Sequence, residues 1–384
     1  MAKKKLKNIS EIRRYFHRNE APIYFISATN FNLLGLDEWV RNFKYINYLD
    51  CYDGKHPNVF CPSEQPHAEF QSIEDINNYL LQHKELIDWT KKRGGKPKFV
   101  FLMFDEQTEK LAKELGAEVW FPKAKLRTRV DNKIETVRIG NKAGVPSVPN
   151  TLAVVKDYKH LCELTEKAKI GNDLVLQSAF GDSGHTTFFI KSEADFRRHE
   201  HEIVGCGEIK IMKRINCRGS AIEACATKQG TIVGPLFHLL EFSGQPFDLD
   251  IEELNARWAD PNMIDSWSQM VIKHTEDSVD IITQAPETGI YRMLSDGSVV
   301  FDRFDYHRRA VESEKEAFFL RILKPGDYRY EGADLGILVT RGRSMTDSFK
   351  LADRSKKWIK GIKSAFSARP LPAAAPSEHA FKIL

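Results

Sequence analysis

The sequence lacks the features that mark a membrane-spanning, zinc-binding or strongly charged protein. No apolar run reaches about 18 residues, the length that predicts a membrane span, and no apolar signal-peptide core follows the basic start. The six cysteines form no C-x-x-C pair, so neither a zinc site nor a disulfide framework is indicated. A formal net charge of +4 over 384 residues argues against a nucleic-acid binder. We therefore expect a cytoplasmic protein with reduced thiols and no membrane or nucleic-acid partner.

Motifs of three common enzyme classes are also missing. No glycine loop ends in Gly-Lys-Ser/Thr, which excludes a P-loop. The chain has no Gly-x-Ser-x-Gly elbow and no His-Glu-x-x-His helix, so the serine-hydrolase and zinc-protease classes have no support. The twelve histidines are scattered along the chain and predict no site by their spacing.

The apolar runs that are present predict an α/β domain over residues 1–125. Strands are expected at 23–28, 98–104 and 118–121, and Asp105 caps a helix that ends before Gly116. Strand–helix–strand order with short connections implies a parallel sheet with right-handed crossovers.

Three further parts follow this domain. Residues 126–261 contain two strands, 174–177 and 188–190, joined by a polar glycine turn, which predicts a hairpin-like flap followed by a helix capped at Ser192. Residues 262–368 form a mixed region in which a helix at 263–274 and a final helix at 348–366 are expected, with strands at 280–283, 289–293, 298–301 and 335–340. Residues 369–384 are rich in proline and alanine and are expected to be disordered.

The strongest local signal for chemistry is the segment Gly181-Asp182-Ser183-Gly184-His185-Thr186-Thr187 between the two strands of the flap. Glycines allow backbone N–H groups to approach a phosphate closely, and hydroxyl side chains add donors. A Gly-Asp-Ser-Gly turn is also common in hairpins that bind nothing. Taken alone, the segment leaves both interpretations open.

The order of the neighbouring motifs favours the phosphate interpretation. Upstream, a helix opens near Asp131-Asn-Lys133 and closes in Ala143-Gly-Val-Pro146; downstream come Met212-Lys-Arg-Ile215 and a strand bearing Glu223. This order resembles the ATP-grasp superfamily, and within it the biotin-carboxylase-like ligases. The resemblance covers most of the chain and is specific mainly over residues 127–235. It implies a Rossmann-like N-terminal domain followed by an ATP-grasp domain, with α+β character in the grasp part.

The resemblance assigns roles to residues of this sequence. Lys133 would contact the nucleotide phosphates, and Glu223 would lie near the ribose or the substrate. Backbone groups of Met212, Lys213, Arg214 and Ile215 would lie along the adenine. The lid loop would consist of Gly181, Asp182, Ser183, Gly184 and Thr186.

Two positions depart from the family pattern. Gln177 stands where many members have a lysine on the strand before the glycine loop, and it brings a hydrogen-bond donor without a charge. Magnesium requires hard oxygen ligands, and the resemblance offers only Glu241, Glu253 and Asn255 for it. Because Asp250 looks like a helix cap and only 30 residues separate Glu223 from Glu253, the alternative is that the metal-binding segment is deleted and the ATP-grasp domain is incomplete.

The resemblance implies an ATP-dependent carboxylate ligase that acts through an acyl or carboxy phosphate. Its cofactors would be ATP and Mg2+, and its substrate a small carboxylate or bicarbonate. The alternative is a shortened, catalytically inactive relative that acts as a non-enzymatic module. The sequence indicates neither the acceptor substrate, biotin included, nor the oligomeric state.

Overall fold

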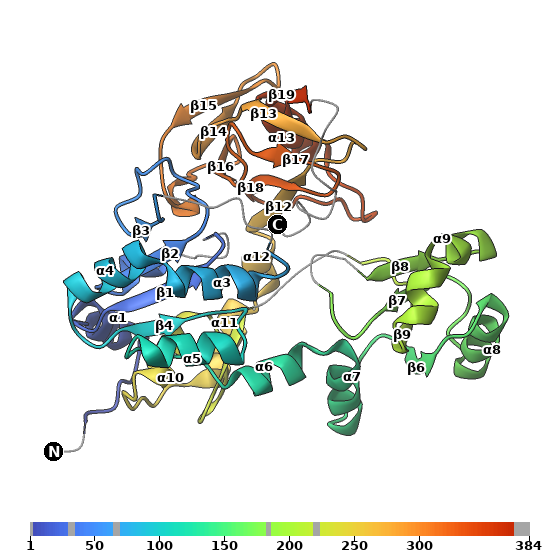
Figure 1. Cartoon of the computed structure of the whole chain (residues 1–384), viewed down its shortest axis with the longest axis horizontal. Coiled ribbons are helices and arrows are strands. Elements are labelled where there is room, and N and C mark those ends of the chain that lie inside the picture. The colour runs from blue at the N-terminus through green and yellow to red at the C-terminus, as the bar shows by residue number, and fades with distance from the viewer. Residues whose placement is uncertain (1–2, 30–34, 64–69, 182–185, 218–222, 372–384) are drawn as a thin grey trace. The chain divides into compact units, whose positions relative to one another are not determined.

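A computed structural model of the protein describes residues 3–29, 35–63, 70–181, 186–217 and 223–371. The chain divides into two compact units (Figure 1). One unit joins Met1–Phe121 to Arg218–Leu384, and the other is the continuous segment Pro122–Cys217. The first of these boundaries lies close to residue 125, where the sequence analysis ends the N-terminal domain. The division into four consecutive parts stays a prediction of the sequence.

The N-terminal part of the first unit contains the predicted parallel sheet. Its strands follow the order β3-β2-β1-β4-β5, and every neighbouring pair is parallel, which confirms the α/β fold class. This order is that of a Rossmann-like half-sheet. The strands are β1 (Ile23–Ser27), β2 (Phe43–Asn47), β3 (Val59–Phe60), β4 (Lys98–Val100) and β5 (Glu118–Val119). The helices are α1 (Ile9–His17), α2 (Leu36–Trp39), α3 (Ile73–Gln82), α4 (Lys84–Arg93) and α5 (Glu106–Glu114).

Two details of this sheet test the sequence directly. Asp105 caps α5, since its carboxylate accepts the N–H of Thr108 at 2.8 Å, as predicted. The strand expected at 98–104 is wrong in its length, because β4 ends at Val100. Beyond it Phe101 and Phe104 are buried against each other, so the apolar run fills the core without continuing the strand.

After the second unit the chain returns to the first and packs on the parallel sheet. The returning segment forms β10 (Ala224–Thr227), β11 (Gly230–Val233), α10 (Leu236–Phe242), α11 (Ile251–Trp258) and α12 (Pro261–Ile264). Ile232 and Phe237 from this segment share a core with Ile23 and Phe43 of the sheet. Within the described residues, the interval from Glu223 to the start of α11 therefore contains one hairpin and one helix.

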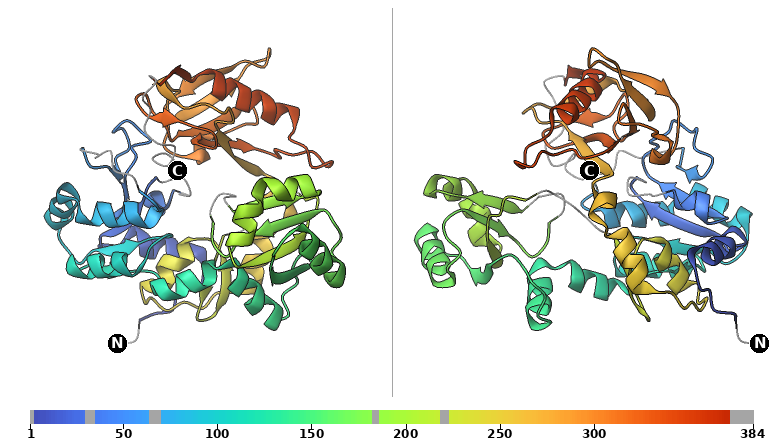
Figure 2. Two further views of the ribbon diagram at one scale, coloured as in Figure 1. Left: turned by 45° about the vertical axis from the view of Figure 1, so that its right-hand side comes forward. Right: turned by 180° about the vertical axis from the view of Figure 1, so that it is seen from behind.

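The C-terminal part of the first unit has an antiparallel sheet in the order β12-β18-β16-β14-β15 and a smaller one in the order β17-β13-β19. The strands are β12 (Trp267–Lys273), β13 (Asp280–Gln284), β14 (Gly289–Met293), β15 (Val299–Arg303), β16 (Glu316–Arg321), β17 (Tyr328–Arg329), β18 (Asp334–Arg341) and β19 (Ser367–Pro370). The helices are η1 (Arg308–Ala310) and α13 (Asp353–Ser364). Figure 2 shows α13 as the red helix beside the strands of this part, and Trp358 and Ile362 are buried in its core.

Three expectations for this region need correction. The helix expected at 263–274 is wrong, because most of that segment is β12, which pairs along its length with β18. The final helix begins at Asp353, five residues later than expected. Strand β19 continues to Pro370, so the residues at 369–370 are ordered by pairing with β13; the predicted tail from residue 372 lies outside the described residues.

The second unit is a small antiparallel sheet with two of its helices on one face. Its strands are ordered β6-β9-β7-β8: β6 (Asn150–Val154), β7 (Leu174–Gln177), β8 (Thr187–Ile190) and β9 (Glu208–Lys213). Its helices are α6 (Ala124–Asp131), α7 (Lys133–Lys142), α8 (Tyr158–Ala168) and α9 (Glu193–Gly205). The antiparallel pairing of β7 with β8 confirms the predicted flap, and Ser192 caps α9 with a capping box.

Two further predictions can be compared with the structure. All six cysteines are free. None of the helices in the described part of the chain combines the length and apolar character that a membrane span requires.

Candidate functional site

The sheet of the second unit has one covered face and one open face. Leu174, Leu176, Ile209 and Ile211 point to a core that α8 and α9 complete. Side chains alternate along a strand, so the residues between them point to the opposite face. The strand register aligns these residues in two rows: Leu152, Lys210, Gln177 and Thr187 form one, and Asn150, Met212, Val175 and Phe189 form the other.

Lys133 lies at the base of the glycine loop. It is the first residue of α7, whose N-cap Asn132 accepts the N–H groups of Ile134 and Glu135 at 3.0 Å. The Lys133 ammonium donates to the carbonyl of Gly181 at 2.6 Å, and its backbone N–H donates to the carbonyl of Ala179 at 2.8 Å. A lysine ammonium has three donors. Within the described residues Gly181 is its one acceptor, so two donors remain for a ligand.

Lys210 places a second cation at this end of the open face. It stands opposite Gln177 in the pairing of β9 with β7. Partial burial lowers the pKa of Lys210 below its usual range, and the charge of Lys133 lowers this pKa further. No carboxylate forms an ion pair with Lys210 in the described part of the chain. Two ammonium groups that repel each other in a partly desolvated place favour an anion between them.

The loop itself is described only at its two ends. Gly181 has φ of 142° and Thr186 has φ of 61°, which for a threonine is an uncommon, strained conformation. The Thr186 hydroxyl donates to the carbonyl of Phe180 at 2.7 Å and closes the loop across its base. Gln177, at the departure from the lysine pattern, donates from its amide to the Thr187 hydroxyl at 3.3 Å. Asp182, Ser183 and Gly184 lie outside the described residues.

The second row of the open face is apolar where the resemblance places the adenine. Met212 and Phe189 flank Val175 across three paired strands, and Phe189 is 56% exposed. The Arg214 guanidinium lies 5.1 Å from the centre of the Phe189 ring. An exposed aromatic ring under a planar cation can stack with a base. Lys213 ends β9, and Ile215 follows it as a 49% exposed side chain.

Glu223 belongs to the other compact unit. Its carbonyl accepts the N–H of Gly234 at 2.8 Å, which closes the β10–β11 hairpin. Desolvation raises the pKa of Glu223, and the nearby Arg308 guanidinium opposes that rise. The role expected for Glu223, near the ribose or substrate, remains a prediction.

The three expected metal ligands are placed on helices. Glu241 lies on α10, and Glu253 and Asn255 lie on α11, whose N-cap is Asp250, as its sequence indicates. Asn255 makes two hydrogen bonds to the backbone of β11: its side-chain oxygen accepts the N–H of Val233 at 3.0 Å, and its amide N–H donates to the carbonyl of Thr231 at 2.8 Å. The amide thus pairs with the free edge of β11 as a strand residue would.

These hydrogen bonds of Asn255 bear on whether the three expected ligands fit a magnesium ion. The Asn255 oxygen is already engaged by a backbone N–H, and Glu253 stands on the exposed side of a capped helix. Asn255 and Glu253 are therefore not prepared as hard oxygen ligands, and the assignment of Glu241, Glu253 and Asn255 to magnesium stays a prediction. We derive no step through magnesium from them.

Sequence reasoning missed Lys210. The signal was present in the segment Glu208-Ile-Lys-Ile-Met, where isoleucines alternate with polar residues. In a half-buried strand such alternation places the lysine on the face opposite the core. What the sequence could not supply was the partner strand that sets Lys210 beside Gln177.

Comparisons with known proteins find similarity only at the level of structure. No family model and no curated protein matches the chain. The biotin carboxylase domain of 2-oxoglutarate carboxylase from Hydrogenobacter thermophilus, in a complex with MgADP, ADP and bicarbonate, aligns over 91% of this chain and 90% of its own at 11% identity and a TM-score of 0.49. Biotin carboxylase from Campylobacter jejuni, in a β-γ-ATP complex, aligns over 91% of this chain and 92% of its own at 11% identity and a TM-score of 0.49. L-amino acid ligase from Bacillus licheniformis aligns over 92% and 100% at 10% identity and 0.46.

These similarities lie at 10–11% sequence identity. They concern the fold alone. Because every one of these TM-scores is below 0.5, the function proposed below depends on this chain's own residues.

Proposed function

We propose that the open face of the second unit binds ATP and that the chain is an ATP-dependent carboxylate ligase. The observation that carries the proposal is the pair Lys133 and Lys210. Lys133 is fixed to Gly181 at the start of the glycine loop, and Lys210 has its pKa lowered by burial and by the charge of Lys133. A polyphosphate supplies the negative charge that such a pair favours.

The two rows of the open face match the two ends of a nucleotide. The row with Lys210 and Gln177 ends at the glycine loop and suits the phosphates. The neighbouring row with Met212 and Phe189 suits the base, which the sequence resemblance also places along residues 212–215. The rows are two residues apart along each strand, a separation of about 7 Å.

The reaction proposed is the formation of an acyl phosphate. An oxygen of the carboxylate, or of bicarbonate, attacks the γ-phosphorus of ATP, and the bond to the β,γ-bridging oxygen breaks as ADP leaves. A nucleophile then attacks the activated carbonyl carbon and releases phosphate. Lys133 and Lys210 would hold the phosphoryl oxygens and stabilise their negative charge, while Gln177 would add an uncharged donor.

A second candidate is a nucleotide-binding protein without ligase activity. The observation that favours it is the engagement of both amide atoms of Asn255 on β11, which leaves the ligands expected for magnesium unprepared. In this case the open face would bind ATP, and no phosphoryl transfer would follow.

Calorimetric titration with ATP, with and without Mg2+, tests the binding claim on the full chain. Lys133→Met keeps most of the side-chain length and removes the charge, and we expect it to weaken ATP binding at least tenfold, equivalent to about 1.4 kcal/mol. Lys167→Met is the matched control, since Lys167 is an exposed residue of α8, the helix that covers the opposite face of the sheet. Wild-type protein that binds no ATP in either condition would refute both candidates.

Measurement of product then separates the two candidates. ADP is quantified with ATP and a panel of small carboxylates and bicarbonate, and hydroxylamine traps any acyl phosphate. Carboxylate-dependent ADP and hydroxamate support the ligase. Tight, Lys133-dependent ATP binding without either product supports the non-catalytic candidate.

A further inference from the structure

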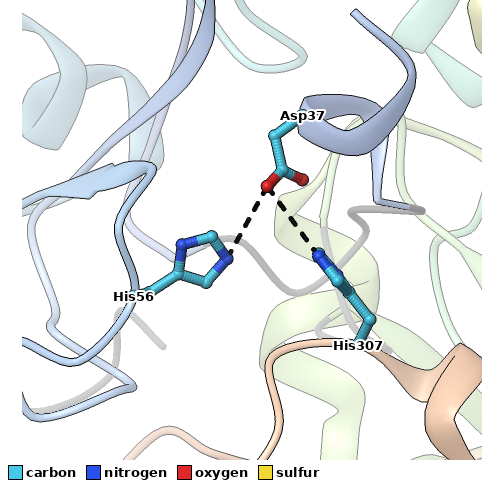
Figure 3. A group of neighbouring side chains, drawn as sticks. All are labelled: Asp37, His56 and His307. Carbon is cyan, nitrogen blue, oxygen red and sulfur yellow. Dashed lines mark ion pairs between the residues drawn. The ribbon is translucent and has the colours of Figure 1, made fainter.

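Three side chains from distant parts of the first unit converge on one buried point (Figure 3). Asp37 is on the short helix α2, His56 is in the loop between β2 and β3, and His307 directly precedes η1. Figure 3 shows both imidazole rings directed at the carboxylate of Asp37. The proposed nucleotide site lies in the other compact unit and uses none of these residues.

The spacing of the three groups differs from that of hydrogen bonds. The Asp37 Oδ2 atom is 4.0 Å from His56 Nε2 and 3.8 Å from His307 Nε2, and the three ligand atoms all lie within 4.8 Å of one another. A hydrogen bond between such atoms would measure about 2.7–3.2 Å. Two ligands that each lie about 2.0–2.1 Å from one metal ion can be up to about 4 Å apart. The gap is therefore of the size that one metal ion fills after a small contraction.

The carboxylate at the centre is fixed and buried. The Asp37 side chain is 2% exposed, Tyr45 donates its hydroxyl to Oδ1 at 2.7 Å, and Asn58 donates its amide to Oδ2 at 2.8 Å. Such outer hydrogen bonds orient the carboxylate ligands of metal ions. They also hold a negative charge in a place where an uncompensated charge is costly.

The Nδ1 atom of His56 carries no proton, because it accepts the backbone N–H of Asn58 at 3.0 Å. The side chain of His56 is 1% exposed, and its Nε2 atom, which faces Asp37, has no hydrogen-bond partner among the described residues. Once the ring proton has moved from Nε2 to Nδ1, the Nε2 atom of His56 and the Asp37 carboxylate face the same gap with the ligand types that a divalent transition metal prefers.

We propose that Asp37, His56 and His307 bind one divalent transition-metal ion of the Zn2+ type. Glu38 lies beside this group, with its Oε1 atom 3.3 Å from His307 Nε2 and its side chain 42% exposed, and it would have to turn toward Asp37 and His56 to become a fourth ligand. The metal would reach the site from the Glu38 side, where the cluster borders solvent. Glu38 also pairs with Arg309, and that pairing would loosen as the carboxylate turns to the metal.

One hydrogen bond must rearrange when the metal binds. The N–H of Asn58 donates to Nδ1 of His56 at 3.0 Å, which places the proton of the neutral ring on Nε2. Metal binding at Nε2 moves that proton to Nδ1, where it meets the Asn58 N–H. The backbone N–H of Asn58 must then turn away, so the NMR resonance of this backbone amide is a local reporter of metal at His56.

The ion would act as a structural link inside the first unit. It would join the connections between the first three strands of the parallel sheet to the segment that opens η1 in the C-terminal part. A metal that binds the folded chain and not the unfolded one raises the melting temperature.

The test uses the full chain, stripped with a chelator, desalted and then titrated with Zn2+ alone at pH 7.5. We expect about one bound equivalent by elemental analysis, a higher melting temperature, and a shift of the Asn58 amide resonance. His307→Gln and His56→Gln should each weaken Zn2+ binding at least tenfold and abolish the thermal shift. His17→Gln, an exposed histidine at the end of α1, is the control that should behave as wild type. Failure of wild type to retain zinc, or equal retention by His307→Gln, overturns the proposal.

X-ray absorption of the zinc-loaded wild type gives an answer that does not require any variant to fold. We expect imidazole and oxygen scatterers and no sulfur. The chain has six free cysteines, which are competing ligands for zinc. A spectrum dominated by sulfur would assign the zinc to those thiols and would overturn the proposal.

Discussion

Replacing Asn255 with aspartate distinguishes a metal ligand from a structural amide. Aspartate keeps an oxygen for magnesium and for the Val233 N–H, but it cannot donate to the Thr231 carbonyl, which accepts the Asn255 amide at 2.8 Å. The carboxylate would instead face that carbonyl oxygen. Losing a partly exposed hydrogen bond and adding this repulsion should cost about 1–2 kcal/mol. That is a factor of about 5 to 30 in the unfolding equilibrium.

The assay is urea unfolding of the full chain, followed by tryptophan fluorescence, together with ATP titration with and without Mg2+. Glu253→Gln is the control on the same helix, an exposed position where we expect a change within about 0.5 kcal/mol. The structural role predicts that Asn255→Asp lowers stability and leaves the magnesium dependence of ATP binding unchanged. An Asn255→Asp protein of wild-type stability that binds MgATP more tightly would refute the reasoning and restore Asn255 as a metal ligand.

Two further predictions concern stability. Gly361→Ala in α13 should destabilise the protein by about 1–2 kcal/mol despite the helix propensity of alanine, because the new Cβ would lie 2.5 Å from Val299. Gly140→Ala in α7 should stabilise the protein by about 0.5–1 kcal/mol, because the nearest atom to its new Cβ would be 3.9 Å away. Denaturant midpoints that rank these two variants in the opposite order would contradict this packing. Burial lowers the pKa of His238 below 6.5, and its Nε2 lies 2.6 Å from the Trp120 carbonyl. Since the depressed pKa favours a neutral ring in the folded state, the stability that depends on it is present above pH 6.5 and is lost as the pH falls below 6.5. His238→Gln should lose less stability than wild type as the pH is lowered from 6.5, as measured in paired unfolding curves.

The sequence predicted the parts of the fold that local patterns determine. The α/β order of the N-terminal domain, the caps at Asp105 and Ser192, and the flap formed by β7 and β8 are all present in the structure. In each case the information lies within a few residues: an apolar run, a cap followed by a helix, or a turn between two strands.

The failures concern elements that distant pairing determines. Residues 267–273 pass for a helix in isolation and form β12 because β18 offers a complementary edge some 70 residues later. The cluster of Asp37, His56 and His307 was invisible for the same reason, since no spacing in the sequence connects its members. Lys210 is an intermediate case, because its strand pattern was readable and its neighbour Gln177 was not.

The affinity of Lys210→Met for ATP tests the central claim most directly, because the structure alone, and not the sequence resemblance, assigns this residue to the site. Calorimetry on the full chain should show ATP binding at least tenfold weaker than in wild type, with Lys167→Met unchanged. The apo protein should remain folded, since Lys210 points away from the core of the second unit. ATP affinity equal to that of wild type in a folded Lys210→Met protein would contradict the assignment of the open face as the nucleotide site.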